Sequence, residues 1–277
     1  MDKDHGKLAW ANPLCVSTLT FIPFDQGREE MIRYTLEGIE AAATAGFTGL
    51  ETWVLPFSQS EEYRRVADQA RTFGLSIQSA HLHKRLLREE ISTALEWLKW
   101  SLDFCLLLDL RATVLHPPYA PFGEALGYTR QFLEGALPLA KERKIIITLE
   151  NVPFQPPGFL EAIARDFPSP WLGFTVDTEF AFVRRVPLSR YWEKLGERVV
   201  NCHLKDSNGR VGGKTGERPY YGFGEGGIDF AGVGESLHRA SYQGPVVVET
   251  PFHLQEQLLP QLKKARRFVE GFLGNGP

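Results

Sequence analysis

The 277-residue chain has few cysteines, and their positions exclude a disulfide framework. Cys15, Cys105 and Cys202 each lie within an apolar segment, and no Cys-x-x-Cys pair occurs. Secreted miniproteins and zinc-ribbon domains need more cysteines at closer spacing. We therefore interpret the three thiols as reduced core residues and expect a cytoplasmic protein.

Neither an excess of charge nor a long apolar run is present. The chain has 31 Lys and Arg against 34 Asp and Glu, a formal net charge of −3. This balance gives no bulk attraction to nucleic acid or to an anionic membrane, so we expect neither as a partner. No charge-free apolar stretch reaches the ~18 residues of a membrane span. A small sugar-like molecule fits the composition better, and a homo-oligomer stays open.

Short apolar segments alternate with helical patterns along the chain. Because alternating strands and helices form a parallel sheet, eight such units predict an α/β fold of the (β/α)₈ TIM-barrel type. Residues 1–12 lack the apolar region of a signal peptide and are expected to form a leader before a single barrel domain at 13–277. The expected strands are Leu14–Ile22, Gly49–Val54, Ser76–His81, Ala112–His116, Ile145–Glu150, Gly173–Asp177, Val199–Leu204 and Val246–Glu249. The expected helices are Glu29–Ala45, Glu61–Phe73, Glu89–Leu108, Gly123–Arg143, Gly158–Arg165, Phe180–Leu195, Phe230–Ala240 and Gln255–Phe272.

Polar side chains stand where the expected strands end. Buried parallel strands read as continuous apolar runs, so a carboxylate or imidazole that closes such a run is not explained by packing. Barrel enzymes carry their active sites at this end of the strands. We therefore expect these side chains to converge on one site: Glu51, His81, His116, Glu150, Asp177, His203 and Glu249.

Four of these residues form a set suited to a metal ion. Glu150, Asp177, His203 and Glu249 end strands five to eight and offer three carboxylates and one imidazole. Adjacent strands lie about 4.8 Å apart, so neighbouring strand ends can surround one ion. Carboxylates gathered in one barrel mouth would repel each other without a cation. We predict one divalent ion, Mn²⁺, Mg²⁺, Co²⁺ or Zn²⁺.

Other residues near the strand ends have two interpretations each. His81 and His116 either hold a second ion together with a bridging Glu150 or hydrogen-bond substrate hydroxyls. Glu51 either contacts substrate or braces a metal ligand. Lys205, two residues after His203, is expected either to stabilise a developing oxyanion or to bind a phosphate or carboxylate. Trp53 and the weaker candidate Arg210 are expected to contact substrate.

A resemblance to a known family rests on seven segments in order: GFTGLETW, LHPP, ITLEN, VDT, HLKDS, GEGGIDF and VVVETP. From about residue 14 to 272 the chain resembles the xylose-isomerase-like TIM-barrel superfamily, in particular its sugar-phosphate isomerase/epimerase-like members. The resemblance implies that Glu150, Asp177, His203 and Glu249 bind one divalent metal. It also implies that Glu150 and Glu249 transfer protons through an enediolate in a metal-dependent sugar isomerase or epimerase.

The chain departs from the family pattern in two places. Phe180 stands where the ketose epimerases usually carry a histidine, and the stretch RPYYGFGEGG replaces the Asp-x-His of the related apurinic endonuclease branch. Both departures disfavour a three-metal nuclease. The alternatives are a metal-dependent hydrolase or endonuclease-like phosphoesterase, an inosose-type dehydratase, and a metal-binding protein without catalysis.

Overall fold

The computed structural model describes residues 12–22, 28–54, 60–83, 86–209, 221–250 and 257–274. Apart from Asn12, the predicted leader lies outside these residues, and so does Arg210.

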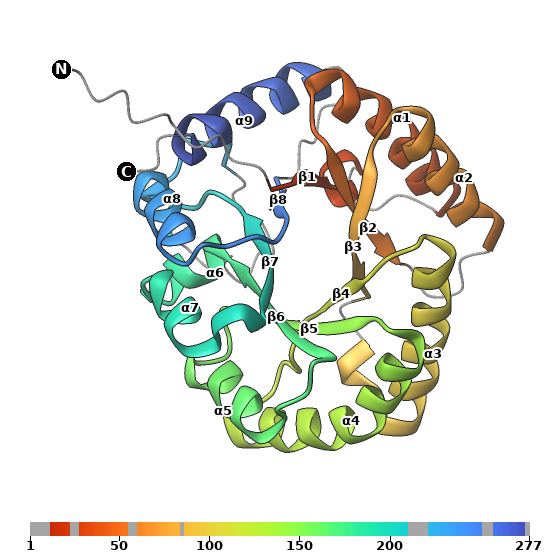
Figure 1. The fold of residues 1–277 in the computed structure, drawn as a ribbon, viewed down its shortest axis with the longest axis vertical. Coiled ribbons are helices and arrows are strands. Elements are labelled where there is room, and N and C mark those ends of the chain that lie inside the picture. The colour runs from red at the N-terminus through yellow and green to blue at the C-terminus, as the bar shows by residue number, and fades with distance from the viewer. Residues whose placement is uncertain are drawn as a thin grey trace.

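Eight parallel strands close into a barrel in sequence order, as Figure 1 shows. β1 pairs with both β2 and β8, which closes the ring. This confirms the predicted (β/α)₈ TIM barrel. The strands are β1 (Leu14–Ser17), β2 (Gly49–Val54), β3 (Ser76–Leu82), β4 (Ala112–Leu115), β5 (Ile146–Glu150), β6 (Leu172–Asp177), β7 (Val199–Leu204) and β8 (Val246–Val248).

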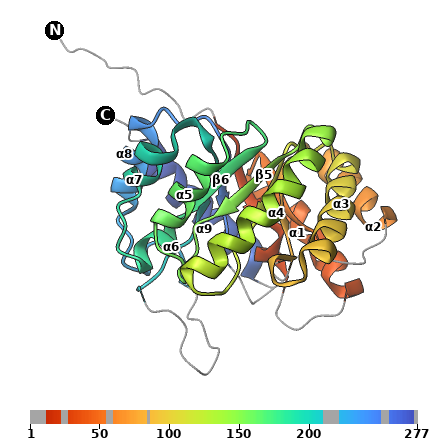
Figure 2. The ribbon, with the colours of Figure 1, turned by 90° about the horizontal axis from the view of Figure 1, so that it is seen from below.

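The helices form an outer layer around the strands (Figure 1), and from the side α3, α4 and α5 lie in front of the barrel (Figure 2). Contacts between the first and last helices join the two ends of this layer. No helix in the described ranges is long and apolar enough to cross a membrane. The helices are α1 (Arg28–Ala45), α2 (Ser60–Thr72), α3 (Ile91–Leu107), α4 (Phe122–Arg143), α5 (Gly158–Asp166), α6 (Thr178–Val183), α7 (Ser189–Leu195), α8 (Phe230–Arg239) and α9 (Leu258–Leu273).

The first strand is shorter than predicted. The expected strand Leu14–Ile22 ends at Ser17, and a 3₁₀ helix follows over Thr18–Phe21. After Ser17, threonine hydroxyls make hydrogen bonds in place of the backbone ladder between strands. Thr18 Oγ1 accepts from the backbone N–H of Trp53, and Thr20 Oγ1 accepts from that of Thr250. The β-branched pattern therefore gave the wrong structure after Ser17, because side-chain hydrogen bonds to neighbouring loops compete with strand pairing.

The predicted helix Phe180–Leu195 is also wrong, because it is divided into α6 and α7. Arg185 adopts a left-handed conformation with φ of 54°. Its N–H donates to Phe182 O, and the N–H of Val186 donates to Ala181 O, which closes the end of α6. Pro187 follows and has no N–H with which to continue the helix.

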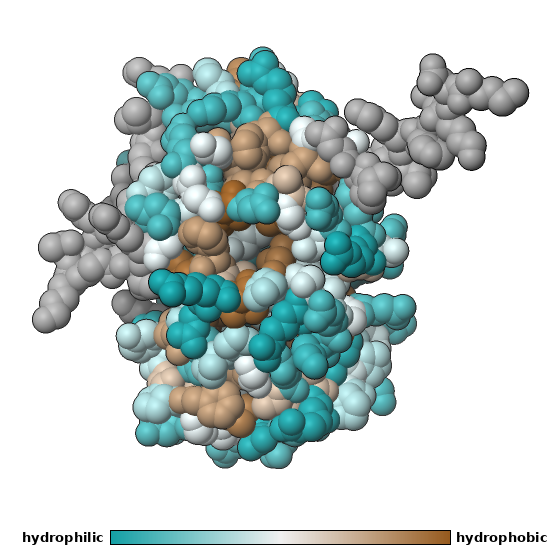
Figure 3. Space-filling view, turned by 90° about the vertical axis from the view of Figure 1, so that its left-hand side faces the viewer, coloured by the Kyte–Doolittle hydropathy of each residue, from teal (hydrophilic) through white to brown (hydrophobic). Residues whose placement is uncertain are grey.

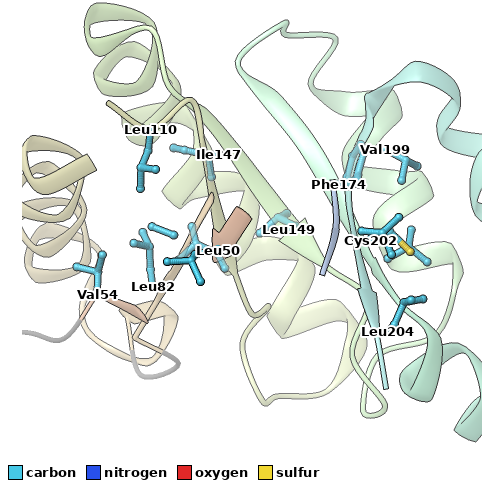
Figure 4. Packing of buried hydrophobic residues seen from close by; sticks show 14 of the residues in the cluster. Leu50, Val54, Leu82, Leu110, Ile147, Leu149, Phe174, Val199, Cys202 and Leu204 are labelled. Atoms are coloured by element: carbon cyan, nitrogen blue, oxygen red, sulfur yellow. The ribbon is translucent and has the colours of Figure 1, made fainter. Parts of the chain in front are cut away.

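Alternation along the strands separates an apolar outer face from a polar inner face. In β5, Ile147 and Leu149 belong to the buried hydrophobic core (Figure 4). Thr148, between them, bonds instead to the hydroxyl of Thr175 on β6 at 2.6 Å. Because strand side chains alternate, Glu150 shares the inner face with Thr148. The polar inner face of the barrel therefore continues up to the strand ends, where the predicted site lies.

A cavity of about 680 Å³ opens elsewhere, between α7 and α8 (Figure 3). Trp192 of α7 and Ser236 of α8 line it, together with Val199 and Val200, the first residues of β7. It adjoins the beginning of β7, whereas His203 lies near the end of that strand. This cavity is therefore at the opposite end of the barrel from the predicted site.

Candidate metal and catalytic centre

The four predicted metal ligands come together at the carboxyl ends of β5 to β8. Glu150 and Asp177 are the last residues of their strands, and Glu249 directly follows β8. Asp177 and His203 are register partners on adjacent strands. Ligand atoms of Glu150, Asp177 and His203 lie within 4.8 Å of one another. All three side chains are fully buried, and that of Glu249 is 12% exposed.

The atoms of this cluster are spaced like donors that share one ion. His203 Nδ1 is 2.8 Å from Glu150 Oε1 and 3.2 Å from Glu249 Oε2. Donors at ~2.1 Å from one metal ion lie roughly 3 Å apart. Apart from its ion-pair contact with His203, the buried Glu249 Oε2 has no hydrogen-bond partner within the described residues. The donor set and its spacing therefore fit a divalent cation.

The electrostatics of the cluster show an excess of negative charge. Burial alone would lower the pKa of His203, but Glu51 and Glu150 outweigh it and hold the pKa well above its ordinary value. Burial, aided by Glu150, raises the pKa of Asp177 to about 6 against the opposing effect of Lys205. One carboxylate is thus poorly compensated by the protein's own positive groups. A bound cation would provide the missing charge.

The predicted catalytic lysine points into the same cluster. Lys205 follows β7, and its Nζ lies 2.9 Å from Asp177 Oδ2 and 2.8 Å from Glu249 Oε1. The ammonium also lies 5.0 Å from the centre of the Phe180 ring. Phe180, which stands where the resemblance to ketose epimerases implies a histidine, therefore supplies an aromatic face for Lys205 and no metal ligand.

The two predicted histidines approach Glu150 from the β3 and β4 side. His116 Nε2 is 2.6 Å from Glu150 Oε2, and His81 Nε2 is 3.7 Å from the same oxygen. Trp53 stacks on His81 with ring centres 4.8 Å apart and planes 14° apart. The structure thus places His81 and His116 beside Glu150, with Trp53 against His81.

Glu51 lies below the mouth, inside the barrel. Its carboxylate is fully buried and contacts His203 together with Ser79 and Asn201. Sequence reasoning missed the latter two. The signal was available, because Ser79 precedes His81 by two residues and Asn201 precedes His203 by two, which places each pair on one face of a strand.

A closed parallel barrel with carboxylates and imidazoles at the carboxyl ends of its strands is the architecture of many metal-dependent barrel enzymes. A comparison with models of protein families identifies which family of barrels this chain matches. The chain belongs to the xylose isomerase-like TIM barrel family, whose model matches residues 39–270.

Relatives with described activities are distant or match only in part. A putative L-ribulose-5-phosphate 3-epimerase, SgbU of Escherichia coli (strain K12), is 33% identical over 78 residues, which span 28% of this chain and 27% of SgbU. The chain thus matches about a quarter of the length of this curated relative.

Solved structures share the fold over nearly the whole chain. A D-psicose 3-epimerase crystallised in the presence of D-fructose matches with a TM-score of 0.75 and 12% identity, covering 95% of this chain and 100% of the other. The IolI protein with a bound zinc atom also gives 0.75, with 13% identity and coverage of 94% and 98%. A D-tagatose 3-epimerase-like protein gives 0.72, with 20% identity and coverage of 94% and 98%.

Proposed function

We propose that this protein is a divalent-metal-dependent epimerase or isomerase that acts on a small ketose or a related polyhydroxy carbonyl compound. One observation carries the proposal: Glu150 and Glu249, from β5 and from the end of β8, meet at the same nitrogen of His203. Two carboxylates that converge on one centre from different strands suit removal and return of a proton. The D-psicose 3-epimerase among the structural neighbours also supports the proposal.

Glu150, Asp177, His203 and Glu249 would hold the ion. When bound, a divalent ion polarises the carbonyl group of a ketose and makes the neighbouring C–H group more acidic. The protein's own residues then need to move one proton between that carbon and a base.

Each proposed acid/base glutamate has a second oxygen that contacts a basic group. Glu150 Oε2 lies against His116 Nε2, and Glu249 Oε1 lies against Lys205 Nζ. One glutamate removes the proton to give an enediolate, and the other returns a proton. Return to the opposite face of the same carbon inverts it, whereas return to the neighbouring carbon isomerises the sugar. We expect His116 and Lys205 to stabilise or exchange the transferred proton.

Turnover of metal-loaded protein tests the proposal. Protein loaded with Mn²⁺ or Co²⁺ should interconvert at least one member of a panel of ketoses and their terminal phosphates. Glu249→Gln should lower kcat by about 10²–10⁴-fold, the usual contribution of a positioned acid or base. Glu37→Gln, on the exposed face of α1, is the matched control and should leave kcat unchanged. No interconversion by the wild type, or full turnover by Glu249→Gln, would contradict the proposal.

A hydrolase with two ions is the second candidate, because His81, His116 and Glu150 form their own group of possible ligands. Phe180 offers no further ligand, so we favour one ion. We predict that His116→Ala keeps about one tightly bound ion per chain while substrate binding or turnover weakens. Elemental analysis of wild type and variant decides this. A fall from two ions to one would favour the hydrolase, with a phosphoester as substrate.

A further inference from the structure

We propose that Glu51 is a positioning residue, which orients the imidazole of His203 so that Nδ1 is presented to the ion. The inference rests on the proposed metal centre and does not depend on which sugar the enzyme accepts. Glu51, which lies below the site, then has a role in metal affinity. This role needs no direct contact between Glu51 and substrate.

The contact between the two residues crosses the barrel. Glu51 lies on β2 and His203 on β7, strands that are not neighbours in the ring. Glu51 Oε2 is 3.0 Å from His203 Nε2, and both side chains are fully buried. The opposite nitrogen, Nδ1, faces Glu150 and Glu249. One edge of the ring therefore meets Glu51, while the other meets the proposed ligands.

The carboxylate of Glu51 is itself held in place. Ser79 Oγ donates to Glu51 Oε2 at 2.7 Å, and Asn201 Nδ2 donates to the same oxygen at 2.9 Å. Fixed side chains below a metal ligand control the orientation of that ligand. With no exposed surface, Glu51 favours the bracing role over the substrate-contacting role that the sequence also allows.

In the neutral ring that binds a metal, the contact also selects which nitrogen carries the single proton. A metal needs the lone pair of Nδ1, so the proton must lie on Nε2. Asn201 Nδ2 is also 3.0 Å from Nε2, and an amide donor there would favour the other tautomer, with the proton on Nδ1. The negatively charged Glu51 is an acceptor for Nε2–H and favours the tautomer that binds metal. Without this charge, Asn201 would favour the wrong one.

Metal affinity without substrate tests the inference. Competition with a chelator gives the Kd for Co²⁺ in wild type, Glu51→Gln, Glu51→Asp and Ser79→Ala. We expect a 10–100-fold weaker Kd in Glu51→Gln, the usual effect of removing a partner of a metal-bound histidine. Glu51→Asp, one methylene shorter, should also weaken binding. Ser79→Ala removes one of the two donors that hold Glu51 and should weaken the Kd less than Glu51→Gln does, whereas Glu37→Gln, on the exposed face of α1, should leave the Kd unchanged. Visible absorption of the bound Co²⁺ should shift in both Glu51 variants.

The outcomes separate this inference from the proposed reaction. A folded Glu51 variant with the wild-type Kd and the wild-type Co²⁺ spectrum would overturn it, and a raised KM alone would assign Glu51 to substrate instead. If Glu51→Gln does not fold, Glu51→Asp decides alone by the same criterion. Wild-type protein that binds Co²⁺ but converts no ketose would overturn the reaction and leave the role of Glu51 intact.

Discussion

At the scale of a single residue, Asp177 both caps a helix of the fold and contributes a carboxylate to the candidate site. Its Oδ1 accepts from the N–H of Phe180 and caps α6, while its Oδ2 faces Lys205. Its backbone N–H donates to Asn151 Oδ1 at 2.6 Å, and Asn151 Nδ2 returns a bond to the carbonyl of Asp177. The side chain is thus fixed by the chain around it, although burial disfavours its charge.

We predict that Asp177→Asn loses metal but stabilises the metal-free protein at neutral pH. The folded pKa of about 6 lies above the ordinary value of 3.8 for an aspartic acid. A carboxyl group with a raised pKa favours folding below its unfolded pKa, and this contribution is lost as pH rises through the folded value. Asparagine keeps the cap and avoids the charge.

Thermal melts in EDTA from pH 4 to pH 8 measure this difference. The Tm advantage of Asp177→Asn should grow between pH 4 and pH 6 and stay constant above pH 7. An advantage that is absent at pH 7.5, or that is largest at pH 4, would show that the charge of Asp177 is well compensated without metal.

Sequence reasoning points to the candidate site residues because each interrupts an apolar strand. Glu150, Asp177 and His203 were found this way, and the structure brings them together. Ser79 and Asn201 were missed because small polar residues inside a strand are common and give no comparable contrast. Their importance depends on a contact that crosses the barrel, and sequence spacing does not show it.

At the scale of elements, the ends of helices were harder to predict than their presence. The break between α6 and α7 depends on Arg185 in a left-handed conformation, which is uncommon for a non-glycine residue, and on Pro187 two residues later. The change from β1 to a 3₁₀ helix depends on hydroxyl bonds with Trp53 and Thr250. The change after β1 follows from partners distant in sequence, so local propensity does not reveal it. Pro187, in contrast, is a local signal for the break after α6.

The end of α4 gives a stability prediction of this kind. Lys144 is exposed and caps the helix with φ of 56° and ψ of 39°, a conformation that costs a non-glycine residue roughly 1–2 kcal/mol. We predict that Lys144→Gly stabilises the protein by about 0.5–1 kcal/mol, because greater freedom in the unfolded chain offsets part of the gain.

Urea unfolding of Lys144→Gly and of a matched control measures the effect. Lys141→Gly makes the same change within the last turn of α4 and should destabilise by about 1 kcal/mol. Equal effects of both substitutions would show that the conformation of Lys144 is not strained.

At the scale of the whole molecule, the proposed ion would link strands that come late in the chain. Its ligands come from β5, β6, β7 and the end of β8, while His81 and His116 approach from β3 and β4. The alternation of strands and helices predicted this convergence correctly, because parallel barrel strands end on one face.

We therefore expect metal to stabilise the folded barrel. A ligand that binds only the folded state adds about 2.7 kcal/mol when its free concentration is 100 times Kd. The Tm of metal-free wild type should rise steadily with added Mn²⁺, whereas Asp177→Ala should show little change. A similar rise in both proteins would indicate that Mn²⁺ binds elsewhere.

Deuterium uptake tests the central claim most directly, because it reports removal and return of the proton even when net conversion is small. Metal-loaded wild type, incubated in D₂O with a ketose that it converts, should place deuterium on the carbon next to the carbonyl group. Glu249→Gln should reduce the rate of uptake by about 10²–10⁴-fold. Conversion of the ketose by the wild type without any deuterium in the product would contradict proton transfer by Glu150 and Glu249.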